Sequence, residues 1–198
     1  MAKIVDYYHF LLSPYAYLGG GRFTEIAARH GATVNVYPVS AAKIFPVSGG
    51  LPLPKRAPQR QAYRLVELAR WRDHLGLPLT LKPRFFPVDE TPAGRMVVAA
   101  RRTGQDALAL SNAILRAVWA EERDIGDPDS LAAVVGEAGF DAAALATAAA
   151  DPAVGAEYEA DNETAIAAGI FGSPTFIIDG EMFWGQDRLD FVDRALAG

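Results

Sequence analysis

The pair Ser13-Pro14 is the first place in the chain where residue type and position together could do chemistry. Serine is a preferred N-cap, and proline suits the first helical position because its missing N–H would have no partner there. A hydroxyl at a helix N-terminus lies where backbone N–H groups and the helix dipole favour an anion. Ser13 is therefore either a cap alone or a group that stabilises negative charge on a ligand.

The other reactive residue types give no second centre. The chain has no cysteine, which excludes disulfides, thiolate metal sites and dithiol redox chemistry by the protein itself. His9, His30 and His74 are scattered and lack the spacing of metal ligands, so we interpret all three as non-catalytic. We expect no metal.

The charge pattern disfavours nucleic acid and leaves one basic segment to explain. The net charge is -5, which argues against general nucleic-acid binding. Between residues 43 and 72, Glu67 is the one acid among seven cations: Lys43, Lys55, Arg56, Arg60, Arg64, Arg70 and Arg72. This segment is either a solvated helical face or a face directed at a small anionic ligand.

The amino-acid composition limits the classes of protein to which the chain can belong. Hydrophobic residues make up 51% and charged residues 22% of the 198 residues, which predicts a substantial core and one domain, with or without an insertion. No apolar run has membrane length, and the first residues do not read as a signal peptide. With no cysteine, these features lead us to expect a cytoplasmic protein that does not bind membranes.

The two ends of the chain predict the elements that would position Ser13. Residues 4–12 form an apolar, aromatic-rich run of strand length, residues 14–30 a helix and residues 33–39 an alternating strand, which together predict a parallel βαβ unit. Residues 169–184 hold two short strand runs around Asp179-Gly180, a strong hairpin signal, and a last helix follows over residues 188–197.

The middle of the chain is predicted to be mostly helical. Residues 41–58 are rich in proline and glycine and predict a long ordered loop or a broken helix. Two later helices begin with Asp127-Pro128 and Asp151-Pro152, so the chain uses the cap-and-proline start where no chemistry is expected. That repetition favours the interpretation of Ser13 as a cap.

A βαβ unit followed by a ββα unit, with proline just before the penultimate strand, is the thioredoxin plan. We therefore predict an α/β, thioredoxin-like fold with a large all-helical insertion between its two halves. Residues 1–42 and 169–198 would form the thioredoxin-like domain, and residues 43–168 the helical insertion domain.

In that fold a redox Cys-x-x-Cys motif occupies the place that Ser13-Pro14 holds here. Two groups of residues resemble the 2-hydroxychromene-2-carboxylate isomerases, relatives of kappa-class glutathione transferases and DsbA-like proteins: Phe10-x-x-Ser13-Pro14-Tyr15-x-Tyr17, and Gly169-Ile-Phe-Gly-Ser-Pro-Thr-Phe176 with Trp184-Gly185-x-Asp187-Arg188. The resemblance spans almost the whole chain. It implies glutathione as cofactor, an isomerase of aromatic-compound catabolism and a homodimer.

The resemblance also implies roles for single residues. Ser13 becomes the catalytic serine, whose hydroxyl donates to the glutathione sulfur and favours the thiolate. Ser173-Pro174 becomes a cis-proline turn, with the Ser173 backbone available to the cysteinyl part of glutathione. Asp187 and Arg188, at the start of the last helix, would hold the γ-glutamyl end, although both could instead be structural.

Two positions depart from the family pattern, and the substrate side is less specific. Arg60 stands where relatives usually carry lysine for the glycyl carboxylate, and Leu51 lies close to where many carry asparagine. Candidates for an aromatic substrate pocket, each also a plausible core residue, are Tyr15, Tyr17, Phe45, Phe85, Phe86 and Trp119.

Three functions remain open at this point. The first is a glutathione-dependent isomerase that converts 2-hydroxychromene-2-carboxylate, or a related intermediate of aromatic degradation, to trans-o-hydroxybenzylidenepyruvate. The second is a kappa-like glutathione transferase that acts on other electrophiles, which Arg60 and Leu51 motivate. The third is a non-catalytic thioredoxin-like binding module.

Overall fold

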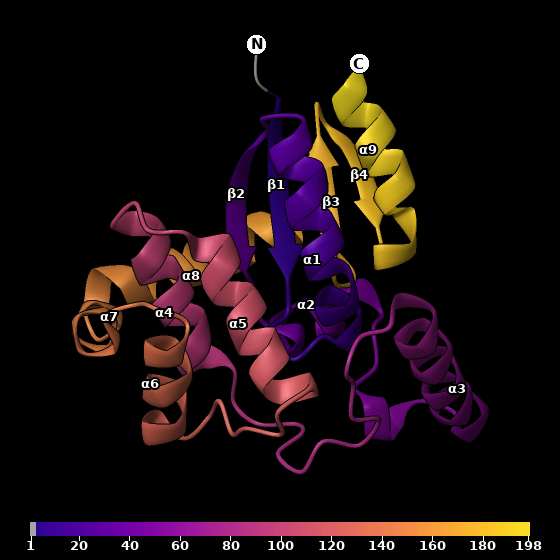
Figure 1. Ribbon diagram of the computed structural model, residues 1–198, viewed down its shortest axis with the longest axis horizontal. Helices are drawn as coiled ribbons and strands as arrows, with labels where there is room; N and C mark the ends of the chain where they lie inside the picture. Colours follow the sequence, from indigo (N-terminus) through magenta and orange to yellow (C-terminus); the bar gives the residue numbers. More distant parts are fainter. Residues whose placement is uncertain (1–2) are drawn as a thin grey trace.

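A four-stranded sheet runs through the centre of the computed structural model, which describes residues 3–198 (Figure 1). Its strands are β1 (Ile4–His9), β2 (Thr33–Pro38), β3 (Thr175–Ile178) and β4 (Glu181–Trp184), in the spatial order β2-β1-β3-β4. Strand β1 is parallel to β2 and antiparallel to β3, and β3 is antiparallel to β4. The thioredoxin-like plan predicted from the two chain ends is confirmed.

Residues that accept a positive φ lie at two connections of the sheet, the end of the helix before β2 and the turn between β3 and β4. Helix α1 (Pro14–Arg29) carries the chain from β1 to β2, and Gly31 takes a positive φ of 58° where that helix ends. The two turn residues of the hairpin, Asp179 and Gly180, have φ values of 51° and 84°. Positive φ at both positions is what a type I′ turn between twisted strands requires.

Helices fill the chain between β2 and β3 and close its C-terminal end. Residues 41–58, for which the sequence predicts a long ordered loop or a broken helix, contain α2 (Ala41–Ser48) and the short 3₁₀ helix η1 (Leu53–Lys55). The remaining elements are α3 (Pro58–Leu75), α4 (Thr91–Arg102), α5 (Ala107–Trp119), α6 (Pro128–Glu137), α7 (Ala142–Ala149), α8 (Pro152–Ala167), the 3₁₀ helix η2 (Gln186–Arg188) and α9 (Leu189–Ala197).

Strand β1 is buried on both faces of the sheet because its side chains alternate. On one face Tyr7 packs against Phe23 of α1, with ring centroids 5.0 Å apart, and against Phe176 of β3, at 5.2 Å. On the other face Tyr8 belongs to a cluster that includes Ile44 of α2. The β1–α1 junction is therefore set in a rigid frame.

The helical segment packs directly on the strands and on α1. Helices α4 and α5 contact β2, and α5 also contacts α1. Figure 1 shows α4, α5, α6 and α7 on one side of the molecule and α3 on the other, with the start of β1 and the end of α9 both at the top of the view. The division into domains at residues 42/43 and 168/169 stays a prediction.

Two features are absent from the described residues. Between residues 3 and 198, no helix combines the length and the apolar character needed to cross a bilayer. Nor does that part of the chain gather three or more histidine or carboxylate side chains in an arrangement suited to a metal ion.

Candidate active site

Ser13 lies at the junction of β1 and α1, as the sequence predicted. Its extended backbone (φ -84°, ψ 117°) is that of an N-cap, and Pro14 follows at the first helical position. The Ser13 Oγ accepts a hydrogen bond from the N–H of Ala16 at 3.2 Å. The side chain thus completes the helix start and also holds its hydroxyl at the positive end of the helix dipole.

The hydroxyl of Ser13 also reaches the segment before β3. It donates to the carbonyl oxygen of Ser173 at 3.1 Å, and the Oγ of Ser173 accepts from the N–H of Phe10 at 2.9 Å. The peptide bond between Ser173 and Pro174 is cis, as the resemblance implied. Two Ser-Pro pairs 160 residues apart therefore meet at one place.

Asp187 and Arg188 lie in η2, directly before α9, and Arg188 is the N-cap residue of that last helix. They form an ion pair with each other, with Arg188 Nη1 2.8 Å from Asp187 Oδ2. Both side chains are exposed and open to a ligand. Because α9 begins only at Leu189, the N-terminal position predicted for Asp187 is that of the short η2 turn.

Close packing fixes η2 against α1. A Cβ at Gly19 would lie 2.8 Å from the Cβ of Gln186, a separation that real side chains avoid. Gly19 therefore lets the backbone of α1 approach η2, which sets the distance between the Ser13 end of α1 and the pair Asp187 and Arg188.

Tyr15 stands among charges from α3 and η2. Burial raises the pKa of its phenol, and the charges that act on it are, in decreasing order, those of Arg64, Glu67, Arg56 and Asp187. The structure thereby brings Tyr15 together with the basic face of α3 and with η2. Its predicted place in a substrate pocket stays a prediction that this geometry supports.

The other aromatic candidates divide into three kinds. Phe45 has its ring under the guanidinium of Arg56, 5.8 Å away, and is partly exposed. Tyr17 donates its hydroxyl to the carbonyl of Pro78 at 2.6 Å, which anchors the segment after α3. Phe85 and Phe86 are partly buried, whereas Trp119 is fully buried in the main core and forms no wall of an open pocket.

The predicted glycyl-carboxylate residue lies in the first turn of α3. Arg60 is exposed, and within residues 3–198 it forms no ion pair. It lies close enough to Arg56 to lower the pKa of that guanidinium, although burial is the larger cause. Leu51, the second departure from the family pattern, is 49% exposed just before η1.

Glu90 is a residue of this site that the sequence did not reveal. It lies immediately before α4, is 7% exposed, and accepts hydrogen bonds from the N–H of Leu12 at 3.1 Å and of Ala41 at 3.2 Å. Burial raises the pKa of its carboxyl to about 7 against the opposing effect of these bonds. One carboxylate thus ties together the residue before Ser13, the start of α2 and the start of α4.

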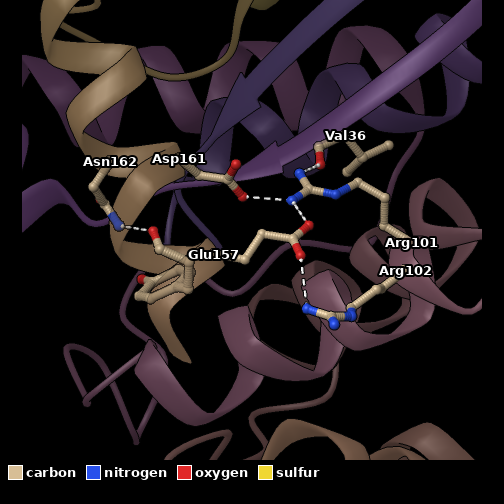
Figure 2. Close-up of polar contacts among 7 residues, drawn as sticks. Val36, Arg101, Arg102, Glu157, Asp161 and Asn162 are labelled. Carbon is tan, nitrogen blue, oxygen red and sulfur yellow. Dashed lines mark hydrogen bonds and ion pairs between the residues drawn. The ribbon is translucent and has the colours of Figure 1, made fainter. Parts of the chain in front are cut away.

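A second polar cluster holds the same region from the side of α8. Figure 2 shows Arg101 between Glu157 and Asp161, with nitrogen–oxygen distances of 2.6 and 2.8 Å, while it also donates to the carbonyl of Val36 at 2.7 Å. Next to Asp161, Asn162 accepts from the N–H of Ser40 at 2.7 Å. The start of α2 is therefore fixed by Asn162 on one side and Glu90 on the other.

His9 does not supply a base for Ser13. Its ring is fully buried and stacks on Tyr7 with centroids 4.5 Å apart and an interplanar angle of 1°. Burial lowers its pKa to about 3, so the imidazole stays neutral. Without a partnered base, Ser13 is suited to donate a hydrogen bond and not to act as a nucleophile.

Comparison with known proteins agrees with this geometry. A DSBA-like thioredoxin domain matches residues 4–197. The 2-hydroxychromene-2-carboxylate isomerase of Pseudomonas putida is 31% identical over 98% of this chain and 94% of its own. A solved structure of a 2-hydroxychromene-2-carboxylate isomerase superposes with a TM-score of 0.80 at 30% identity, covering 98% of this chain and 94% of that one. The human glutathione S-transferase kappa 1 is 27% identical over 99% of this chain and 92% of its own.

Proposed function

The chain belongs to the DSBA-like thioredoxin family and, within it, to the 2-hydroxychromene-2-carboxylate isomerases, and from this premise we propose that it is a glutathione-dependent isomerase. Its substrate would be 2-hydroxychromene-2-carboxylate or a related intermediate of aromatic degradation, and its product trans-o-hydroxybenzylidenepyruvate. The observation that carries the proposal is the hydroxyl of Ser13, held at the N-terminus of α1 and against the residue before cis Pro174.

The donor set of the site fits glutathione. A hydroxyl at a helix N-terminus favours a thiolate, and the backbone of Ser173 offers the pairing that a cysteinyl residue needs. The carboxylate of Asp187 suits an ammonium group, and the guanidinium of Arg60 suits a carboxylate. These residue types match the sulfur, backbone and charged ends of the tripeptide.

The hydroxyl of Ser13 has one proton, so it can donate to only one acceptor at a time. In the structure that proton goes to the carbonyl of Ser173, while its oxygen accepts from Ala16. With glutathione bound, the hydroxyl of Ser13 would donate to the sulfur, and the carbonyl of Ser173 would be free to accept from a backbone N–H of the ligand. Hydrogen bonding to the charged form lowers the pKa of a thiol, and so does the helix dipole.

Bound glutathione would supply a thiolate nucleophile that is regenerated at the end of the isomerisation. Ser13 holds the sulfur charge at the start and at the end of the isomerisation. Glu90 keeps the loop before Ser13 in place through the N–H of Leu12. The fixed helix start means that the hydroxyl needs no reorganisation when negative charge returns to the sulfur.

A kappa-like transferase is the alternative function. Arg60 and Leu51 differ from the family pattern, and the human kappa transferase matches the whole length of the chain. Product analysis separates the two functions, because an isomerase returns all of its glutathione whereas a transferase consumes one molecule for each product. Net loss of glutathione during turnover of the chromene substrate would establish the transferase.

The experiment that tests the proposal measures isomerisation with and without glutathione. We expect activity that depends on glutathione and disappears when S-methylglutathione, which has no free thiol, replaces it. If the chain binds neither compound in a calorimetric titration, the non-catalytic binding module becomes the better account. A homodimer remains a prediction from the resemblance, which light scattering tests, and a cytoplasmic location remains a prediction from the composition.

A further inference from the structure

Arg64 is an arginine of α3 whose environment differs from that of the paired arginines. Its side chain is partly buried, and its guanidinium lies 5.6 Å from the ring centroid of Phe86 and 5.5 Å from that of Trp119. No acid side chain pairs with it within residues 3–198, whereas the partly buried Arg101 is held by both Glu157 and Asp161. The ring faces partly offset its charge and leave its donors available.

The pocket that Arg64 lines has the chemistry of an aromatic acid site. It has a volume of about 340 Å³ and lies between α3 and the segment after it, with Leu65, Leu81 and Phe86 as apolar walls. Lys82 is a second cation on the lining, and no aspartate or glutamate is part of it. A flat apolar ring with one carboxylate matches both the walls and the charge.

The pocket lies on α3, a helix that contacts α1, and the N-terminus of α1 is the proposed sulfur site. Helices α1 and α3 contact each other, and among the surrounding charges Arg64 acts most strongly on Tyr15, two residues after Ser13. Burial lowers the pKa of Arg64, and among residues 3–198 no acid side chain pairs with its guanidinium. An incoming carboxylate would compensate the desolvation of this cation.

We propose that Arg64 and its pocket bind the carboxylate and ring of the aromatic substrate, apart from the groups that hold glutathione. This inference rests on the proposed function for the identity of the substrate, and it assigns the recognition of that substrate to one side chain. Arginine offers a carboxylate two parallel hydrogen bonds, so it fixes the orientation of the ring as well as its charge.

The same carboxylate chemistry has a second source, the glycyl end of glutathione, and the experiment distinguishes the two. The probes are chromone-2-carboxylate, a stable bicyclic acid, and chromone, the same ring without the carboxylate. Each is titrated calorimetrically into the protein without glutathione. Glutathione is titrated separately into the same variants, which are Arg64→Met, Arg64→Lys and, as the matched control on α3, Arg72→Met, whose guanidinium pairs with Asp73.

The parent protein should bind chromone-2-carboxylate at least about tenfold more tightly than chromone, as a charge-assisted hydrogen bond predicts. Arg64→Met should abolish that preference, Arg64→Lys should retain part of it, and Arg72→Met should retain it fully. Circular dichroism checks that each variant is folded, and the lysine variant carries the test if the methionine variant is not.

Two results would overturn the assignment. One is an unchanged preference for the acid in folded Arg64→Met or, if that variant does not fold, an unchanged preference in Arg64→Lys. The other is a loss of glutathione affinity in Arg64→Met as large as the loss of chromone-2-carboxylate affinity, which would give Arg64 to the cofactor. Because the chromone titrations contain no glutathione, failure of glutathione to bind contradicts the proposed function alone.

Discussion

The hydroxyl of Ser13 donates to the carbonyl oxygen of Ser173 at 3.1 Å and so joins the two halves of a thioredoxin-like sheet at its candidate active site. Phe10 and the side chain of Ser173 make the companion bond at 2.9 Å. Ser13 bonds to the backbone of Ser173, whereas Phe10 bonds to its side chain. Substitution of Ser13 therefore tests the proposed catalytic hydroxyl, and substitution of Ser173 tests a structural bond.

Removal of the Ser13 hydroxyl should reduce catalysis far more than removal of the Ser173 hydroxyl. In Ser13→Ala the thiolate loses its hydrogen bond, and we expect kcat/KM to fall roughly 100-fold, the magnitude typical of one lost charge-stabilising donor. Ser173→Ala keeps its carbonyl and loses only the bond from Phe10, which should lower stability by about 1 kcal/mol. Steady-state kinetics and urea unfolding of both variants give the comparison. Equal losses of activity would contradict the assigned role of Ser13.

Gly19 should be intolerant of a side chain, whereas Gly21 in the same helix should not be. A Cβ at Gly19 meets Gln186 at 2.8 Å, and nothing lies within 4 Å of one at Gly21. Gly19→Ala should destabilise the protein by about 1–3 kcal/mol through overpacking and weaken glutathione binding by shifting η2. Gly21→Ala should be neutral or stabilising by up to about 1 kcal/mol.

Chemical denaturation and glutathione titration of the two alanine variants check this prediction. If Gly19→Ala were as stable as Gly21→Ala and bound glutathione equally well, the packing of α1 on η2 would not position Asp187.

Glu90 should make stability depend on pH in a direction opposite to that of a typical surface carboxylate. Its pKa is about 7 in the folded protein and near 4.5 unfolded, so the folded state binds more protons between these values. Its contribution is therefore fully present below about pH 4.5 and is lost as pH rises through about 7. Because one pKa unit corresponds to about 1.4 kcal/mol, the unfolding free energy should fall by about 3 kcal/mol over this range.

Glu90→Gln removes this titration while keeping the shape of the side chain. The difference in unfolding free energy between the variant and the parent should shift in favour of the variant as pH rises from 5 to 8. The neighbouring titratable groups are Asp89, which also raises the pKa of Glu90, and Tyr158, which stays neutral over this range. A difference that did not change with pH would show that Glu90 is ionised in the folded protein at all these values.

Asn162 should matter to stability because it caps the start of α2 from another helix. Asn162→Ala leaves the buried N–H of Ser40 without its acceptor and should cost about 1–3 kcal/mol. The adjacent Glu163 is exposed, so Glu163→Ala is a matched control expected to change stability by less than about 0.5 kcal/mol. Urea midpoints of the two variants decide the matter, and equal midpoints would exclude a role for this bond.

Local chemistry in the sequence was sufficient for much of the fold. Ser13-Pro14, Asp127-Pro128 and Asp151-Pro152 start helices because a side-chain oxygen and a proline satisfy a helix N-terminus wherever they occur. Asp179-Gly180 gives the hairpin for a different local reason, because its turn needs residues that accept positive φ. These signals act over a few residues, so they can be read without knowing the rest of the structure.

Long-range contacts explain what the sequence did not reveal. Glu90 reads as an ordinary acid before a helix, and nothing nearby indicates that it binds the N–H of Leu12, 78 residues away. The helix α2 contains Pro46, a local signal against a helix, and it is held instead by Ile44 in the second core cluster and by acceptors from Asn162 and Glu90. Trp119, predicted as a possible pocket wall, is buried because α5 packs inside the core.

The most direct test of the account is the pKa of the glutathione thiol when it is bound to the protein. The chain has no cysteine, so the ultraviolet absorbance of a thiolate in the complex comes from glutathione alone. We predict a pKa at least about one unit below that of free glutathione in the parent protein, and a return toward the free value in Ser13→Ala. A bound thiol that titrates in the parent as it does in solution would contradict the central claim that Ser13 stabilises the thiolate.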